Sequence, residues 1–288
     1  MSIIIIIFFV VFLRFVLEPD KHFIFRSNPF SAFDTENENY NRSPKYLRFK
    51  NNYSMKALNQ FMEREIPFYR LLSKREKYEF LVRLRLMLKH KYFSGRQGLT
   101  VTEDMMLIFG GLMVQITFGF KDFTFPHFGC VAIFPDVFYS RLFEKYVKGL
   151  TVYHSGIIFV SWPDVVEGID NETDKLNLAL HELAHALYLD YFEHDPTVNG
   201  FGRWMTHAVP ELEKMKRSGK QMFLRSYAAS NIHEFWAVCV EHFFEAPLEF
   251  EKEMPELYRE MCIVLKQDMA ARLQRAIDSG ERKMPDAA

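Results

Sequence analysis

The chain is organised around Leu176-Asn-Leu-Ala-Leu-His-Glu-Leu-Ala-His-Ala-Leu187, which contains the pattern His-Glu-x-x-His. On a helix, residues four apart lie on one face, one turn from each other. His181 and His185 would therefore stand side by side, able to hold one metal ion between them. Glu182 would lie on the adjacent strip, where it can reach a water on that ion without being a ligand itself.

The surroundings of the motif predict a buried helix, because residues 176–189 are apolar on nearly every side. Buried polar groups without partners cost about 1–3 kcal/mol each. A zinc ion bound by neutral imidazoles would satisfy both histidines. The alternative is a chance motif whose histidines are hydrogen-bonded within a core. We favour the metal because the motif and its buried-helix context agree.

Composition limits the function classes that need to be considered. The 288 residues suit one large domain or two small ones, and 30 Phe residues can supply a sizeable core. The net charge of −1 gives no basic surface for nucleic acid, so we expect no such partner. Cys130, Cys239 and Cys262 are few and widely separated, which argues against a disulfide framework and fits a reducing compartment.

The N-terminus carries an apolar run from Ile3 to Leu17 that only Arg14 interrupts. A helix over this run would span about 22 Å, less than the hydrocarbon core of about 30 Å. No Lys or Arg precedes it, so it lacks the basic start of a secretory signal, which disfavours a secreted degradative protease. Arg14 lies near its C-terminal end and Lys21 and Arg26 follow it, which predicts a cytoplasmic location for the rest of the chain. We interpret the run as a membrane anchor; the alternatives are a misassigned start or a tail packed on the protein.

We divide the sequence into an apolar segment at 1–26, a linker at 27–52, a globular domain at 53–279 and a polar tail at 280–288. The domain is predicted to be α+β, mostly helical with a small mixed sheet. Helices are expected at 73–93, opened by a capping box, and at 102–117, 176–189, 211–225, 235–244 and 255–277. Strands are expected at 130–134, 156–162 and, more weakly, 150–153. Residues 118–128 are expected to be a loop, 163–173 a polar connection and 195–202 a turn.

A catalytic zinc ion needs three protein ligands and an open position, so the third ligand must come from outside the motif. Glu234 is the best candidate, because it is a charge in the first turn of an otherwise apolar helix. However, Asn231-x-x-Glu234 also has the form of a capping box, in which the glutamate only caps backbone donors. The pattern alone leaves these two interpretations equal. Rival ligands by chemistry are His194, His207, His233 and His242, although a single histidine is more often a core or surface residue.

Further stretches accompany the motif: Val131-Ala-Ile-Phe-Pro135, Gly156-Ile-Ile-Phe-Val-Ser-Trp162, Tyr227-Ala-Ala-Ser230 and Glu234-Phe-Trp-Ala-Val-Cys-Val-Glu-His-Phe-Phe-Glu-Ala-Pro247. With them, the chain resembles the Mlc titration factor A (MtfA) family of zinc-dependent peptidases, whose catalytic part is similar to that of anthrax lethal factor. The resemblance runs from about Leu71 to about Leu273. Its most specific element is the Tyr-Ala-Ala stretch with a glutamate seven residues past the tyrosine.

This resemblance implies a zincin-like metallopeptidase domain and assigns roles by position. His181 and His185 match the two histidine ligands, and Glu182 matches the catalytic glutamate. Glu234 matches the glutamate ligand, which favours the ligand over the cap. Tyr227 matches an active-site tyrosine, with a packing role in the core as its alternative.

Three other positions qualify the match. Glu241 also corresponds to a family glutamate, and its spacing of seven from Glu234 allows a contact behind a ligand, but we assign it no firm role. Ile232 stands where the family usually has proline. Tyr188 stands where aspartate is common, so a supporting carboxylate is either missing or supplied from elsewhere.

The leading hypothesis is a zinc-dependent peptidase that acts on a peptide or protein, with Glu182 as the general base and Tyr227 as a donor to the oxyanion. An extended substrate is expected to pair with a strand edge, which we assign to residues 156–160. The alternative is a membrane-tethered regulatory protein that sequesters a transcription factor, with a zinc site that is structural or vestigial. The soluble enterobacterial members of the family bind the repressor Mlc, and nothing in this sequence identifies a surface for that partner. A structural site needs no base, so the presence of Glu182 favours the enzyme.

Overall fold

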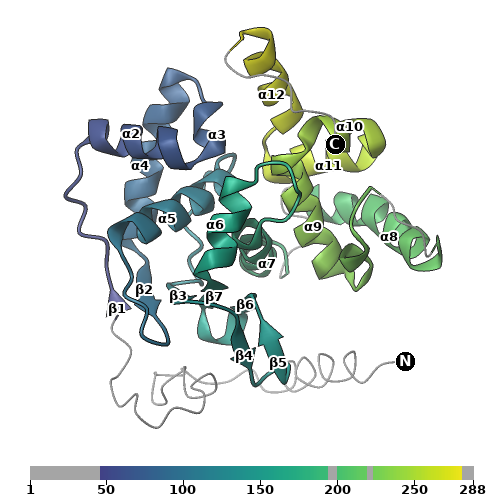
Figure 1. Ribbon diagram of the computed structural model, residues 1–288. Helices are drawn as coiled ribbons and strands as arrows, with labels where there is room; N and C mark the ends of the chain where they lie inside the picture. The colour runs from purple at the N-terminus through teal and green to yellow at the C-terminus, as the bar shows by residue number, and fades with distance from the viewer. Residues whose placement is uncertain (1–45, 194–199, 219–222, 281–288) are drawn as a thin grey trace. The chain divides into compact units, whose positions relative to one another are not determined.

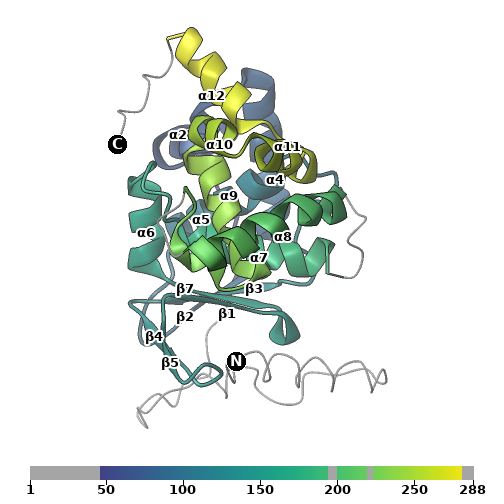
Figure 2. The same ribbon diagram turned by 90° about the vertical axis from the view of Figure 1, so that its right-hand side faces the viewer.

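The computed structural model describes residues 46–193, 200–218 and 223–280. In this part of the chain, helices lie on one face of a five-stranded sheet and a short hairpin lies on the other (Figures 1 and 2). The sheet order is β1 (Tyr46–Leu47), β2 (Tyr92–Gly95), β3 (Cys130–Phe134), β7 (Ile157–Ser161) and β6 (Gly149–Val152). The pairs β2–β3 and β3–β7 are parallel, whereas β1 and β6 pair antiparallel at the two edges. The predicted mostly helical α+β fold with a small mixed sheet is confirmed.

The central strands β3 and β7 are apolar and buried along nearly their whole length. Parallel strands of this kind need cover on both faces. The helices cover one face, and the hairpin of β4 (Phe138–Ser140) and β5 (Lys145–Val147) covers part of the other, where the Phe138 and Phe134 rings stack 4.1 Å apart. The strand predicted more weakly at 150–153 is present as β6, which pairs antiparallel with β7.

The prediction that an extended substrate pairs with the edge at residues 156–160 is wrong, because β7 is paired with β3 on one side and with β6 on the other. The outer strand beside the motif helix is β6 instead. The turn into β7 follows a short 3-10 segment, η1 (Tyr153–Ser155), and ends at Gly156, whose φ of 62° favours glycine.

The N-terminal helices are α2 (Met55–Glu65), α3 (Pro67–Arg70), α4 (Lys74–Lys89) and α5 (Glu103–Thr117). The capping box that opens α4 is complete, and α5 begins after Thr102 as predicted. The predicted end of α4 near Phe93 is wrong, because residues 92–95 pair with β3 as a parallel strand. A Cβ added at Gly110 would approach Leu88 Cδ2 to 2.7 Å, so glycine permits the close α4–α5 packing.

Helix α6 (Trp162–Asp170) precedes the motif helix α7 (Leu178–Tyr191). Residues 163–173, predicted as a polar connection, instead form most of α6, which begins with proline in its first turn and buries Val165. The motif helix α7 is capped by Asn177, whose Oδ1 accepts a hydrogen bond from Leu180 N at 3.0 Å. Its position between the sheet and the other helices explains its apolar sequence (Figure 2).

The C-terminal part contains α8 (Phe201–Ser218), η3 (Ser226–Ala229), α9 (Ile232–Glu245), α10 (Pro247–Glu253), α11 (Pro255–Leu265) and α12 (Met269–Asp278). The helix predicted at 211–225 starts earlier and continues through Pro210. The single helix predicted at 255–277 is two helices, because Lys266 adopts a left-handed conformation with φ of 53°. The turn predicted at 195–202 lies largely outside the described residues.

The apolar run at 3–17, most of the segment 27–52 and most of the tail at 280–288 also lie outside the described residues. The end of the segment predicted as a linker contributes β1 to the sheet. Within the three described ranges, every helix is too short or too polar to cross a lipid bilayer.

Candidate metal centre

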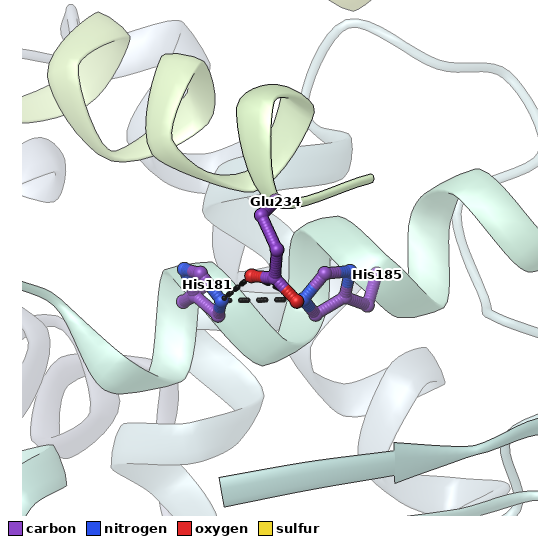
Figure 3. A group of neighbouring side chains, drawn as sticks. All are labelled: His181, His185 and Glu234. Atoms are coloured by element: carbon purple, nitrogen blue, oxygen red, sulfur yellow. Dashed lines mark hydrogen bonds and ion pairs between the residues drawn. The ribbon is translucent and has the colours of Figure 1, made fainter. Parts of the chain in front are cut away.

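Two neighbouring helices bring three ligand atoms together (Figure 3). His181 and His185 project from successive turns of α7, and their Nε2 atoms are 3.2 Å apart. Glu234 comes from the first turn of α9, and its Oε2 lies 3.0 Å from His181 Nε2 and 3.5 Å from His185 Nε2. Among the described residues, these three form a group whose ligand atoms could bind one metal ion.

The spacing of these atoms fits a metal ion. Nitrogen and oxygen ligands about 2.0–2.1 Å from one tetrahedral ion lie about 3.3 Å from each other. The three separations between the ligand atoms here, 3.0, 3.2 and 3.5 Å, are close to that value. Two imidazole nitrogens and one carboxylate oxygen leave a fourth position for water or substrate. The donors and their geometry therefore suit a catalytic site better than a closed structural site.

The start of α9 determines where Glu234 points. Asn231 caps the helix, and its Oδ1 accepts hydrogen bonds from the backbone nitrogens of His233 and Glu234 at 2.9 and 3.1 Å. The Glu234 carboxylate turns toward the two motif histidines. This geometry favours the ligand over the cap, and Asn231 provides a helix start where the family usually has proline at position 232.

Hydrogen bonds within the group favour the charged forms of His181 and Glu234. Burial lowers the pKa of His181, which is 8% exposed, but its hydrogen bonds to Glu234 and Glu241 outweigh burial and raise that pKa to about 10. Burial raises the pKa of Glu234, but its hydrogen bonds to His181 and His185 hold that pKa well below its usual range. Metal ligands must be deprotonated, so binding of an ion here would require a neutral His181 and an ionised Glu234.

Glu241 lies behind His181. Its Oε1 is 2.6 Å from His181 Nδ1, so we infer that Nδ1–H donates to Glu241 and that Nε2 is left to face the metal position. Glu241 is 1% exposed. The supporting carboxylate that Tyr188 does not provide therefore comes from α9; the Tyr188 ring packs against His233 instead, with ring centres 4.6 Å apart.

Glu182 is held by the outer strand β6. Thr151 Oγ1 lies 2.8 Å from Glu182 Oε2 and 3.0 Å from the Glu182 backbone oxygen, so its one hydroxyl hydrogen can donate to either oxygen. A Cβ at Gly149 would lie 2.7 Å from Glu182 Cγ, so only glycine leaves room for this side chain. Burial raises the pKa of Glu182, which is 5% exposed. Sequence reasoning missed Thr151 and Gly149, although a glycine within a strand often marks such a close approach.

Tyr227 lies on η3 at the open side of the group. Its ring centre is 6.0 Å from that of His181, and the residue is 50% exposed. Partial burial and interaction with Glu234, including a hydrogen bond, raise the pKa of the Tyr227 hydroxyl. The exposure argues against the alternative of a core tyrosine, and the neutral hydroxyl is a hydrogen-bond donor near the ligand atoms.

The rival histidines lie elsewhere or make other contacts. His207 on α8 faces Glu256, with 3.6 Å between Nδ1 and Oε2. His242 Nδ1 is 2.9 Å from a backbone carbonyl of its own helix, and burial lowers its pKa to about 4. His233 packs on Tyr188, and His194 lies outside the described residues.

Comparisons with known proteins cover most of the chain. A family model described as glucose-regulated metallo-peptidase M90 matches residues 39–265. Mlc titration factor A of Yersinia pestis is 28% identical over 260 residues, covering 80% of this chain and 93% of that protein, and the protein of the same name from Yersinia pseudotuberculosis matches equally. An uncharacterized protein of Synechocystis is 23% identical over 217 residues, covering 67% of this chain and 78% of that protein.

Proposed function

Because this chain belongs to the M90 family of glucose-regulated metallopeptidases, we propose that it is a zinc-dependent peptidase in which His181, His185 and Glu234 bind the ion. The observation that carries the proposal is the group of three ligand atoms, separated as tetrahedral ligands would be, with a buried glutamate between the two histidines in sequence. Two histidines and a glutamate are an established ligand set for catalytic zinc.

The residues around the group suit peptide-bond hydrolysis. A zinc ion supplies Lewis acidity toward the scissile carbonyl and lowers the pKa of the attacking water. Glu182 accepts the proton of that water and delivers it to the leaving amine. Its raised pKa brings the carboxyl closer to the range in which it can both take and return a proton. The Tyr227 hydroxyl donates a hydrogen bond to the oxyanion that develops on the carbonyl oxygen.

The outer strand β6 is the best place for an extended substrate. Among the described residues it is the last strand of the sheet on that side, so its outer backbone groups can pair with a peptide. Thr151 on the same strand contacts Glu182, so a peptide along β6 would pass close to the general base. The substrate class we propose is therefore a peptide or protein segment bound in extended form.

Metal analysis and peptide cleavage with the full-length chain test the proposal. We expect about one zinc ion per chain, loss of cleavage on chelation and recovery with stoichiometric zinc. Products from a denatured protein or a peptide library would be identified by mass spectrometry. A zinc-loaded chain that cleaves none of these substrates would contradict the peptidase.

A second candidate is a regulatory binding protein with a structural metal. It is supported by the name of the Yersinia relatives, Mlc titration factor A. Under this hypothesis, the chain would bind a transcription regulator equally well whether or not Glu182 is intact, and no peptide bond would be cleaved. Binding without cleavage would therefore separate this candidate from the peptidase.

Replacing Tyr227 by Phe removes the hydroxyl and little else. If that hydroxyl stabilises the oxyanion, we expect the turnover number to fall by on the order of 10²–10³ with zinc content and thermal midpoint unchanged. Steady-state kinetics at saturating zinc measure the effect. An unchanged turnover number would reduce Tyr227 to a packing residue.

Replacing Gly149 by Ala should move Glu182 without touching a ligand, because the new Cβ would overlap the Glu182 side chain. A displacement of about 1 Å can lower catalysis by on the order of 10², so we expect a loss of that size in kcat with zinc retained. Gly129→Ala is the matched control, since a Cβ there would have no neighbour within 4 Å. Equal activity of the two variants would show that Gly149 does not position the base.

We further propose that the apolar run at 3–17 anchors the enzyme to the membrane, with its domain in the cytoplasm. The support comes from sequence alone. The run is apolar, and the basic residues Arg14, Lys21 and Arg26 lie near or beyond its C-terminal end. Deleting residues 1–26 preserves β1 at 46–47 and should release the protein into the soluble fraction without changing its zinc content. Full-length protein that stays in the supernatant after high-speed sedimentation would refute the anchor. Digestion by protease added to intact cells would refute the orientation.

A further inference from the structure

Arg225 contacts three separate parts of the site. It precedes η3, the segment that carries Tyr227, and its guanidinium carbon is 5.8 Å from the Tyr227 ring centre. Its Nη2 donates to Glu241 Oε1 at 2.8 Å. Its Nη1 donates to the backbone oxygen of Lys175, two residues before the cap of the motif helix, at 3.3 Å. One side chain thus joins η3, α9 and the approach to α7.

The contact with Glu241 extends to a metal ligand. Glu241 Oε1 accepts hydrogen bonds from both His181 Nδ1 and Arg225 Nη2. Because Glu241 is almost fully buried, its carboxylate needs a counter-charge, and a buried pair that loses one partner is strongly destabilised. The carboxylate that orients His181 is therefore itself held by Arg225.

We propose that Arg225 is a positioning residue that couples the orientation of His181 to the placement of Tyr227. The inference rests on the proposed function, in which His181 binds the metal and Tyr227 donates to the oxyanion. The guanidinium hydrogen-bonds the carboxylate behind the ligand and approaches the aromatic ring of the donor. A shift of the arginine would disturb both groups together.

The chemistry of arginine gives the proposal a specific signature. A guanidinium is a planar fork that can donate in two directions while its face lies against a ring, whereas an ammonium is a point charge without this planarity. Arg225→Lys should therefore keep the counter-charge for Glu241 but lose the placement of Tyr227. Arg225→Met should lose both.

The experiment measures zinc affinity and kinetics separately. Zinc dissociation constants come from competition with a chelator in the full-length chain, and kcat and KM are measured at saturating zinc. We expect Arg225→Met to bind zinc about 10–100-fold more weakly and to have a reduced kcat. Arg225→Lys should recover most of the zinc affinity while its kcat stays low. Arg259→Met, at an exposed arginine on α11, is the matched control and should leave both quantities unchanged.

Coupling to Tyr227 has its own readout. If Arg225 places the tyrosine, Tyr227→Phe should lower kcat much less in the Arg225→Met background than in the parent, since non-additivity reports a shared effect. Additive losses would overturn the coupling, as would parent-like zinc affinity in Arg225→Met. If Arg225→Met fails to fold, Arg225→Lys carries the test, and a parent-like kcat there overturns the proposal. Absence of cleavage in the parent would refute the peptidase, while the zinc measurements would still test the link to His181.

Discussion

Replacing Glu182 by Gln is expected to lower peptide cleavage by on the order of 10²–10⁴, the range of general acid–base catalysis, while the zinc ion stays bound. Glutamine has nearly the same shape, and its amide oxygen can still accept the hydrogen bond from Thr151. It cannot take a proton from water at neutral pH, so only the chemical step is removed. Zinc content and kcat measured on the same preparation separate binding from chemistry.

Glu256→Gln is the matched control for this substitution, because Glu256 is an exposed glutamate on α11. It should cleave at the parent rate. Parent-rate cleavage by Glu182→Gln as well would show that another group takes the proton, and the mechanism proposed above would be wrong.

Replacing Glu234 by Ala is expected to strip the metal and with it all activity, because the site would retain only two protein ligands. A glutamate that only capped the helix would behave differently: its loss would cost about 0.5–2 kcal/mol of stability and leave the metal bound. Zinc content and thermal midpoint of the purified variant decide between the two roles.

Asn231→Ala is the matched comparison, because Asn231 caps α9 and does not belong to the ligand group. It should lower the thermal midpoint and keep the zinc, the reverse of the pattern expected for Glu234→Ala. Full zinc retention in Glu234→Ala would refute the ligand assignment and direct attention to the adjacent His233.

The ends of several elements could not be predicted because distant partners determine them. The helical pattern of α4 continues in sequence toward Phe93, but Phe93 pairs with Val131 as a parallel strand, a contact that no local pattern contains. Residues 163–173 are predicted from sequence as a polar connection, yet most of them form α6. Their helix is stabilised on one face, where Val165 is buried and Gly168 lies against Asn177.

The candidate site, likewise, could be predicted from the sequence only in part. The two histidines and Glu182 follow from spacing within one helix. The spacing of seven between Glu234 and Glu241 allowed a contact behind a ligand but left the role of Glu241 open, and the fold places Glu241 against His181 Nδ1. Thr151 and Arg225 could not be foreseen, because a strand and a 3-10 segment bring them to the site only through the tertiary fold.

The outer strand β6 has a further consequence for solubility. Within the described ranges, β6 is the last strand of the sheet, and an exposed strand edge can recruit other chains and start aggregation. Here the strand has only four residues and begins with glycine, which weakens any lasting pairing. The short length of this edge limits how many backbone groups another chain can pair with there, which favours a brief encounter over lasting self-association.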